Sequence, residues 1–375
     1  MTEPSSRRSL LAGRDPQSAA TISRLLDIAK QGLRGMHADG EFVFTMRGTR
    51  AGDGSWRLSP AGTSLRYAAI TALGLLRHPE AVQRSVLGGD TAQDLIARLA
   101  KQLPSVANVG DAALICWAAA EAGHEAIDPA LKRLAELQEN GGPGFVVEAA
   151  WVLSALVAVR ASADVEKPLA RARGRLLGAR PERLYPHVIG GEGSWFRSHV
   201  GSFAAQVYPI QALARLHRSA DDRQALATAN SVADSICSLQ GADGQWWWHY
   251  DARTGGVVEK YPVYTVHQHA MGPMALVDLA EAGGDDHLDS ICRGIRWLES
   301  RPESAEALML DAPPITWRKV ARNDPRKVVR GLRATSTRMV PGLRLSVLDR
   351  MFPPGPVDYE CRPYEFGWLL MTWAS

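Results

Sequence analysis

The sequence has little of what marks a specialised class of protein. It has only four cysteines, without any CxxC spacing, which argues against both a zinc knuckle and a disulfide framework. No apolar run reaches the roughly 18 to 20 uncharged residues that span a bilayer. The net charge of +3 over 375 residues is too small to imply a strongly basic nucleic-acid-binding protein. With 46% apolar and 22% charged residues, the composition is that of an ordinary soluble globular chain.

The N-terminus lacks a continuous apolar stretch. Residues 6–11 resemble the start of a twin-arginine export signal, but Arg14 and Asp15 interrupt it before an apolar segment develops. We therefore expect a cytoplasmic protein, with a flexible N-terminal segment at residues 1–16.

Apolar residues recur with a period near 3.6 along most of the chain, and strand-like alternation is confined to short pieces such as residues 41–46. Six amphipathic helices with a solvated face are expected at residues 18–33, 91–103, 129–138, 165–177, 222–239 and 286–298. Each is followed by a helix that is apolar nearly all round, at residues 65–76, 112–122, 147–159, 202–216, 267–282 and 363–373. A helix that is apolar on every face must be surrounded by protein. The alternation predicts an all-α fold, an (α/α)6 toroid of six helical hairpins that forms a single domain over residues 17–375.

Four long connections lead from an outer helix to the next inner one, at residues 37–64, 178–201, 240–266 and 300–362. They all emerge at the end of the toroid where the inner helices begin, and long structured loops tend to be functional. Six helix N-termini converge there, which favours polar or anionic ligands. Six of the 11 tryptophans fall in these loops. We therefore predict the site at this mouth.

The loops share a short pattern of acid, Gly, any residue and aromatic, at residues 39–42, 53–56, 192–195 and 243–246. The last copy belongs to a QxxxGxW motif at residues 240–246, and a degraded copy contains Gln138, Gly142, Gly144 and Phe145. On this motif the chain resembles the squalene-cyclase and prenyltransferase-like α/α toroids, in which the Gln caps helix ends and the Trp packs across the turn. The architecture is also similar to carbohydrate-active toroids, including unsaturated glucuronyl hydrolases, polysaccharide lyases and N-acylglucosamine 2-epimerases. These resemblances imply the fold more than any one reaction.

The densest group of aromatic and titratable residues spans residues 245–269 and leads directly into an inner helix. Aromatic faces stack on sugar rings, while carboxylates and imidazoles recognise hydroxyls and transfer protons. His267, at the helix entrance, is the first choice for proton transfer because imidazole titrates near neutrality. The other expected catalytic residues are Tyr264, His199 and Glu360. The expected substrate-binding residues are Trp195, Tyr208, Trp247, Glu259, Tyr261, His269, Arg362 and Tyr364.

Each of these residues also has a purely structural interpretation. A core histidine is satisfied by a neighbouring hydroxyl or carbonyl, and polar residues on a dry helix such as Tyr208 hydrogen-bond within the protein. Arg362 can pair with Glu360 or with Glu365. His267 and His269 have the spacing of a metal-binding pair, but a third ligand is not visible nearby. We expect neither a metal nor a cofactor.

Residues 316–350 carry ten Lys or Arg against two Asp, a formal charge of +8 that leaves −5 on the rest of the chain. A solvated surface is the ordinary explanation of such a run. Its position in the longest mouth loop favours an anionic substrate, such as a uronate-containing saccharide or a diphosphate-linked lipid. We expect no nucleic-acid partner, because the basic residues are not interleaved with aromatics across a strand surface.

These patterns favour a carbohydrate-active enzyme that uses acid/base chemistry on an anionic, uronate-containing saccharide or oligosaccharide. A lyase or epimerase is favoured over a hydrolase, because a His, Tyr and Arg set suits proton abstraction beside a carboxylate, whereas hydrolysis relies on two carboxylates. A terpenoid cyclase or prenyl-group enzyme is the alternative; the DxDD acid motif is absent, and the DDxxD pattern at residues 285–289 opens an outer helix, where Asp is a favoured cap. A non-catalytic glycan-binding toroid is the third possibility.

Overall fold

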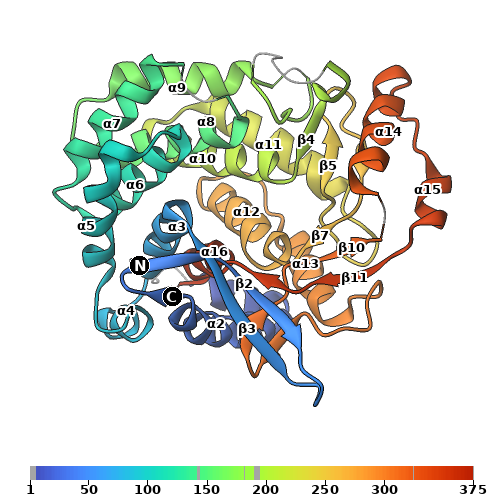
Figure 1. Ribbon diagram of the computed structural model, residues 1–375. Coiled ribbons are helices and arrows are strands. Elements are labelled where there is room, and N and C mark those ends of the chain that lie inside the picture. The colour runs from blue at the N-terminus through green and yellow to red at the C-terminus, as the bar shows by residue number, and fades with distance from the viewer. Residues whose placement is uncertain (1–5, 142–143, 181, 190–194, 324, 375) are drawn as a thin grey trace.

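Six helices form a closed inner ring in the computed structural model (Figure 1). The structure describes residues 6–141, 144–180, 182–189, 195–323 and 325–374. Each inner helix contacts the next, and the last contacts the first, which closes the ring. The inner helices are α3 (Leu65–Leu75), α6 (Val109–Ala122), α8 (Val146–Val159), α10 (Ala204–Ala220), α12 (Gly272–Glu281) and α16 (Pro363–Trp373).

Six further helices surround this ring. They are α2 (Pro16–Gly35), α5 (Ala92–Gln102), α7 (Ile127–Glu139), α9 (Glu166–Gly178), α11 (Arg223–Ser238) and α13 (Leu288–Ser300). The two rings differ in burial as their sequences predict, since α8 buries eleven of its 14 residues and α9 only three of 13. The twelve helices predicted from apolar periodicity are all present, with ends that differ by a few residues.

Two glycines allow the ring to close between α3 and α16. A Cβ atom on Gly74 would clash with the carbonyl oxygen of Gly367, and one on Gly367 would lie 2.9 Å from the carbonyl oxygen of Ile70. Only glycine permits backbones to approach this closely. The first and last inner helices therefore pack backbone to backbone.

The long loops at the mouth pair with one another as antiparallel strands. One sheet contains β4 (Val200–Ser202), β5 (His249–Asp251) and β6 (Val257–Glu259), and a second contains β7 (Val263–Tyr264), β10 (Lys319–Arg322) and β11 (Pro354–Asp358). The third joins β1 (His37–Ala38), β2 (Glu41–Arg50), β3 (Trp56–Thr63) and β12 (Glu360–Cys361), and β8 (Met309–Asp311) pairs with β9 (Pro314–Thr316). Only the strand at residues 41–46 was expected. The eight-residue β3 was not predicted, and the other strands, of two to five residues, carry too little alternation to predict. The loops are thus tied together across the mouth.

The N-terminal segment differs from the expected flexible tail. Residues Arg7–Arg14 form helix α1, and Leu11 on it is fully buried. The Arg7 guanidinium bonds Asp278 and Glu281 on α12 at 2.5 and 2.6 Å. A buried apolar side chain and ion pairs therefore hold this helix on the barrel. Residues 1–5 lie outside the described part of the chain.

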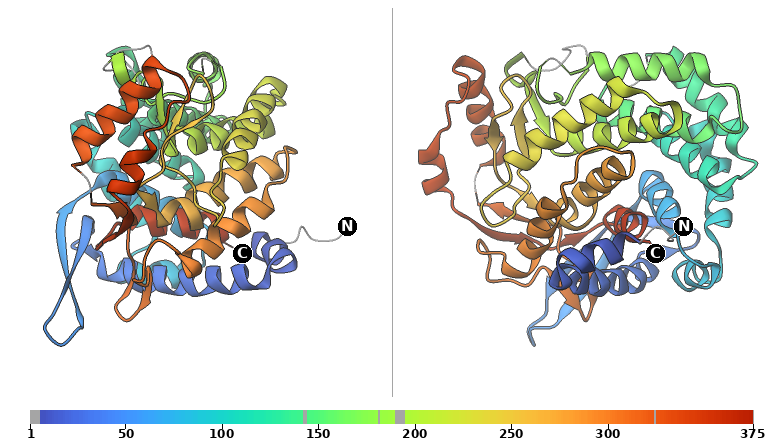
Figure 2. Two further views of the ribbon diagram at one scale, coloured as in Figure 1. Left: turned by 90° about the vertical axis from the view of Figure 1, so that its right-hand side faces the viewer. Right: turned by 180° about the vertical axis from the view of Figure 1, so that it is seen from behind.

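The remaining helices lie in the connections. They are α4 (Glu80–Leu87), η1 (Leu103–Ser105), η2 (Trp195–Arg197), η3 (His267–Met271), α14 (Arg326–Met339) and α15 (Ser346–Met351). Helices α14 and α15, within the last long loop, form the edge of the molecule on the right of Figure 1, and the β2–β3 hairpin projects from another side (Figure 2). Within the described residues, no helix is long and apolar enough to cross a membrane.

Candidate functional site

A cavity of about 570 Å³ opens at the end of the ring where the inner helices begin. Its walls come from the first turns of α3, α8, α10 and α16, and from the mouth strands and loops. This is the end at which the sequence predicts the site. The paired strands of the loops form part of the cavity wall, so that residues far apart in sequence line the same cavity.

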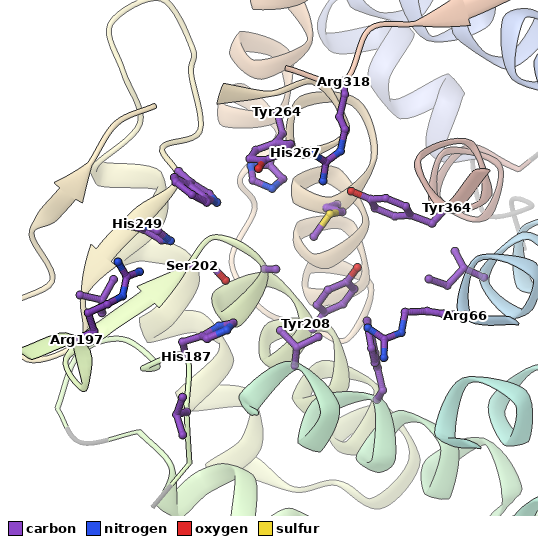
Figure 3. A pocket seen from close by; sticks show the side chains of 18 of the residues that line it. Arg66, His187, Arg197, Ser202, Tyr208, His249, Tyr264, His267, Arg318 and Tyr364 are labelled. Atoms are coloured by element: carbon purple, nitrogen blue, oxygen red, sulfur yellow. The ribbon is translucent and has the colours of Figure 1, made fainter. Parts of the chain in front are cut away.

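The cavity is cationic and rich in hydrogen-bond donors. Four arginines, three histidines and four tyrosines line it, and no carboxylate of the described residues does. The labelled side chains in Figure 3 converge from several elements, with Arg318 beside Tyr364 on one side and Arg197 beside His249 on another. The arginines, histidines and tyrosines of the lining are Arg66, Arg197, Arg318, Arg330, His187, His249, His267, Tyr67, Tyr208, Tyr264 and Tyr364.

Acidic side chains stand behind these cations instead of in the cavity. The Arg66 Nε bonds the Oδ1 of Asp111 at 2.6 Å. The Arg318 Nε lies 3.5 Å from the Oε1 of Glu365, which is fully buried. The Arg66 Nη2 donates to the Oδ1 of Asn108 at 2.9 Å, which leaves its Nη1 for a ligand, while the ion pair of Arg318 uses its Nε. An Arg fork suits carboxylate or phosphate oxygens. The cavity is therefore suited to an anionic ligand.

His249 is oriented by a carboxylate. The register of β4, β5 and β6 places Ser202, His249 and Glu259 in one row across the sheet, and cross-strand neighbours share a face. The His249 Nδ1 lies 3.0 Å from the Oε2 of Glu259. A proton on Nδ1 donates to the carboxylate, which leaves the lone pair on Nε2. Burial lowers the pKa of His249, although Glu259 partly opposes the shift, so this imidazole is a neutral base at pH 7.

His267 and Tyr264 form a second group. Their ring centroids lie 4.9 Å apart, and His267 opens η3, a π-helical turn in which the N–H of Gly272 bonds the His267 carbonyl. Such turns are frequent at functional sites. Burial, with smaller contributions from Arg318 and His269, lowers the pKa of His267 to about 3. Burial also raises the pKa of Tyr264, so at neutral pH a neutral imidazole stands beside a protonated phenol.

Arg197 and Arg330 bring two positive charges to the side of the cavity that holds His249. The Arg330 guanidinium lies over the Trp248 ring, 4.2 Å from its centroid, and its Nε is 3.8 Å from the Oε2 of Glu259. Burial and then the charge of Arg330 lower the pKa of Arg197. The Glu259 carboxylate, which already bonds His249, is the one negative charge near the two guanidinium groups of Arg197 and Arg330 among the described residues. This imbalance favours an anion between them.

Of the residues expected to be catalytic, the cavity brings together His267 and Tyr264. His199 is buried outside the cavity lining, with its Nε2 2.9 Å from the Thr337 hydroxyl. Glu360 lies on β12, where its carboxylate is 3.2 Å from Arg362. Both contacts agree with the purely structural interpretation of these two residues.

Of the expected substrate-binding residues, Tyr208 and Tyr364 line the cavity. Glu259 lies behind His249, and Arg362 donates to the Tyr67 hydroxyl at 3.1 Å. Three others are buried and absent from the lining of the cavity, with partners of their own: Trp247 against Lys260, Tyr261 donating to Glu303 at 2.6 Å, and His269 accepting at its carbonyl from Trp373. The side chain of Trp195 lies outside the described part of the structure.

Several lining residues were not singled out by the sequence analysis. Arg318 and Arg330 belong to the basic segment, and nothing in its composition separates them from its surface arginines. Trp248 and His249 lie inside the aromatic cluster at residues 245–269 but could not be ranked above their neighbours. His187 had no signal in the sequence. What identifies His249 is its position opposite Glu259 in a pair of strands. That position depends on how the two strands align, which the sequence does not give.

The tryptophan-rich loops mark the site less directly than expected. Trp246 and Trp317 are fully buried, and Trp56 packs on Trp317 with centroids 4.6 Å apart. Among the loop tryptophans whose side chains are described, only Trp248 lines the cavity. Trp151, from inner helix α8, lines it as well. Most of these loop tryptophans therefore pack within the loops.

Residues of the QxxxGxW and DDxxD patterns also make structural hydrogen bonds. The Gln240 side chain donates to the carbonyls of Gly244 and Ser290 at 2.9 Å, which bridges the turn and the first part of α13. Asp286 accepts from the N–H of Leu288 at 2.8 Å, as a cap does. Gly142 and residues 192–194 of the repeated patterns lie outside the described residues. Within the described part of the chain, no group of three or more His, Cys, Asp or Glu could hold a metal ion.

No family model matches the chain, and no curated protein matches it in sequence. Its fold is similar to that of a sugar epimerase from a ruminal bacterium, at 12% identity and a TM-score of 0.60, over 95% of this chain and 98% of that chain. It is also similar to an unsaturated glucuronyl hydrolase from Bacillus sp. GL1, responsible for the degradation of glycosaminoglycan, at 13% identity and a TM-score of 0.56, over 94% and 95% of the two chains. An unsaturated glucuronyl hydrolase specific for heparin matches at 13% identity with a TM-score of 0.54, over 96% of each chain.

These matches confirm the all-α toroid. The resemblance to carbohydrate-active toroids is supported at the level of the fold. The resemblance to squalene-cyclase-like toroids stays a prediction from the QxxxGxW motif.

Proposed function

We propose that the chain is a carbohydrate-active enzyme that binds a uronate-containing saccharide and removes the proton beside its carboxylate. The observation that carries the proposal is the lining of the cavity, in which four arginines and three histidines meet without a carboxylate among the described residues. The folds of the sugar epimerase and the glucuronyl hydrolases support a saccharide as the ligand.

The proton beside a carboxylate is weakly acidic, and its removal leaves an enolate that carries two negative charges. An Arg fork on the carboxylate stabilises that charge. Arg318 is placed for this role, because its Nε faces buried Glu365 and its side chain points toward the space between His267 and Tyr364 in Figure 3. His249, with Glu259 behind it, is the base. Tyr264 and His267 supply the second proton-transfer group from another wall.

Two outcomes start from this enolate. Return of a proton to the opposite face inverts the carbon, which is epimerisation. Departure of the sugar oxygen on the next carbon forms a double bond, which is elimination; a phenol such as Tyr264 would protonate that oxygen. Hydrolysis by paired carboxylates is disfavoured, because none lines the cavity within the described residues.

The experiment is incubation with uronate oligosaccharides in D₂O. Deuterium beside the carboxylate, seen by NMR, indicates proton removal, and ultraviolet absorbance of an unsaturated product separates elimination from epimerisation. His249→Gln should slow the appearance of both signals by about 100-fold or more, whereas His217→Gln, at the far end of α10, should leave them unchanged. Hydrolysis without deuterium incorporation would refute the mechanism. Thermal stabilisation by prenyl diphosphates alone would favour the terpenoid alternative, and binding without turnover would favour a glycan-binding protein.

A further inference from the structure

Helix α14 exposes three large apolar side chains to solvent. Val328, Leu332 and Met339 occupy one face of the helix and are 62%, 50% and 73% exposed. The inward face holds Val329 and Ala334, which are 3% and 1% exposed, together with Arg333, which is 5% exposed and bonds Asp349 at 2.7 Å. An ordinary surface helix keeps its apolar side chains on the inward face, whereas α14 also exposes three large ones.

Four more exposed apolar side chains follow α14 in the chain. Val340, Leu343, Val347 and Met351, in the connection and on α15, are each more than 40% exposed. Seven of the ten exposed large apolar side chains in the described part of the chain thus fall within residues 328–351. We name these seven residues the α14–α15 face. Concentrated exposed apolar groups mark interaction sites.

The same surface carries positive charge that the protein does not neutralise. The acid between residues 328 and 351, Asp349, is held by Arg322 and Arg333 at 3.1 and 2.7 Å. Arg338, Arg344 and Arg350 have no hydrogen bond or ion pair with any described residue. The α14–α15 face therefore combines aliphatic side chains with free guanidinium groups.

We propose that the α14–α15 face binds an anionic lipid membrane surface. Aliphatic side chains enter the boundary between headgroups and acyl chains, and guanidinium groups pair with lipid phosphates. Figures 1 and 2 show α14 and α15 as a projecting edge of the molecule, which suits a flat surface. A two-fold dimer through this face would oppose the same unpaired arginines from both copies, so a second copy is disfavoured.

Membrane binding would also bring the cavity close to the lipid surface. Arg330 on the inward side of α14 lines the cavity and lies over Trp248. The membrane-facing and cavity-facing residues thus belong to one helix. This inference does not depend on the proposed reaction, because it follows from exposure and charge alone.

The test is flotation of the full chain with phosphatidylcholine vesicles, with and without phosphatidylglycerol. Binding is expected only to the anionic vesicles and should weaken with salt. Leu332→Glu with Met339→Glu should abolish it, while Leu10→Glu, at a 51% exposed position on α1, should not. Arg344→Glu with Arg350→Glu should weaken binding by at least about fivefold for each arginine.

Light scattering and thermal unfolding of the same variants complete the test. All should unfold at the temperature of the unmodified chain, since the changed side chains are exposed. Absence of binding to anionic vesicles would overturn the proposal, as would binding that both double variants retain. A dimer that Leu332→Glu with Met339→Glu converts to a monomer would assign the face to a second copy instead.

Discussion

Replacement of the buried Glu365 by glutamine should change how stability depends on pH. Glu365 is fully buried, and neither of its carboxyl oxygens has a hydrogen-bond partner among the described residues. Burial raises its pKa to about 8. The charges of Arg318, Arg362 and Lys319 lower this pKa, and the charge of Asp358 raises it further. Glu365→Gln keeps the shape of the side chain and removes its titration.

The magnitude follows from linkage between protonation and folding. The folded-state pKa of about 8 lies above the usual value of 4.5, so between these values the folded state keeps a proton that the unfolded state has lost. The stabilisation is fully present below the unfolded pKa and is lost as pH rises through the folded pKa. Each pH unit in this window costs about 1.4 kcal/mol, or about 4 kcal/mol from about pH 5 to about pH 8.

Scanning calorimetry at these two pH values measures the effect. At about 0.8 kcal/mol per kelvin of unfolding entropy for this length, the unmodified chain should lose roughly 5 °C more than Glu365→Gln between them. Glu80→Gln, whose side chain is 62% exposed, serves as the control and should follow the unmodified chain. An equal pH dependence in the unmodified chain and Glu365→Gln would refute a raised pKa at this position.

Three further predictions concern the cavity and the fold. Arg318→Met should weaken binding of a uronate oligosaccharide by about 10- to 100-fold in calorimetric titration, since a hydrogen-bonded charge is lost; unchanged affinity would remove Arg318 from the site. His249→Gln should slow deuterium exchange by about 100-fold or more, and Glu259→Gln should alter its pH profile. Gly244→Ala should lower the free energy of unfolding more than Gly54→Ala in urea titrations. Both glycines have φ above +80°, but only a Cβ on Gly244 clashes with the Arg293 carbonyl, so equal losses would contradict the packing; strain alone costs about 1 kcal/mol.

The helical plan was predictable because it is a local property. The spacing of apolar residues shows whether a helix is buried on every side or on one face. Each helix could therefore be assigned to the inner or the outer ring from its own sequence. Their alternation then implied the ring and the end at which the long loops meet. The strands at the mouth left no comparable signal, because pairs such as β7 with β10 join short segments that are distant in sequence.

The candidate site was predictable only in part. His267, Tyr208 and Tyr364 lie in the first two turns of inner helices, and Tyr264 lies just before one, so their place at the mouth followed from the helical plan. Their neighbours His199 and His269 have similar sequence surroundings, yet His199 bonds Thr337 on α14 and His269 lies in the core. Which way a side chain points depends on backbone register and on packing partners from elsewhere in the chain.

The sequence by itself determined the toroid, its mouth and the cationic character of the last loop, because these depend on composition and periodicity. Only the tertiary structure decided which arginines face the cavity and which face solvent. Arg318 lies between β9 and β10 against Glu365, whereas Arg344 and Arg350 have no ion-pair partner among the described residues and lie near aliphatic side chains of the α14–α15 face. Charge summed along a segment cannot separate these environments, since the difference arises from contacts between residues far apart in sequence.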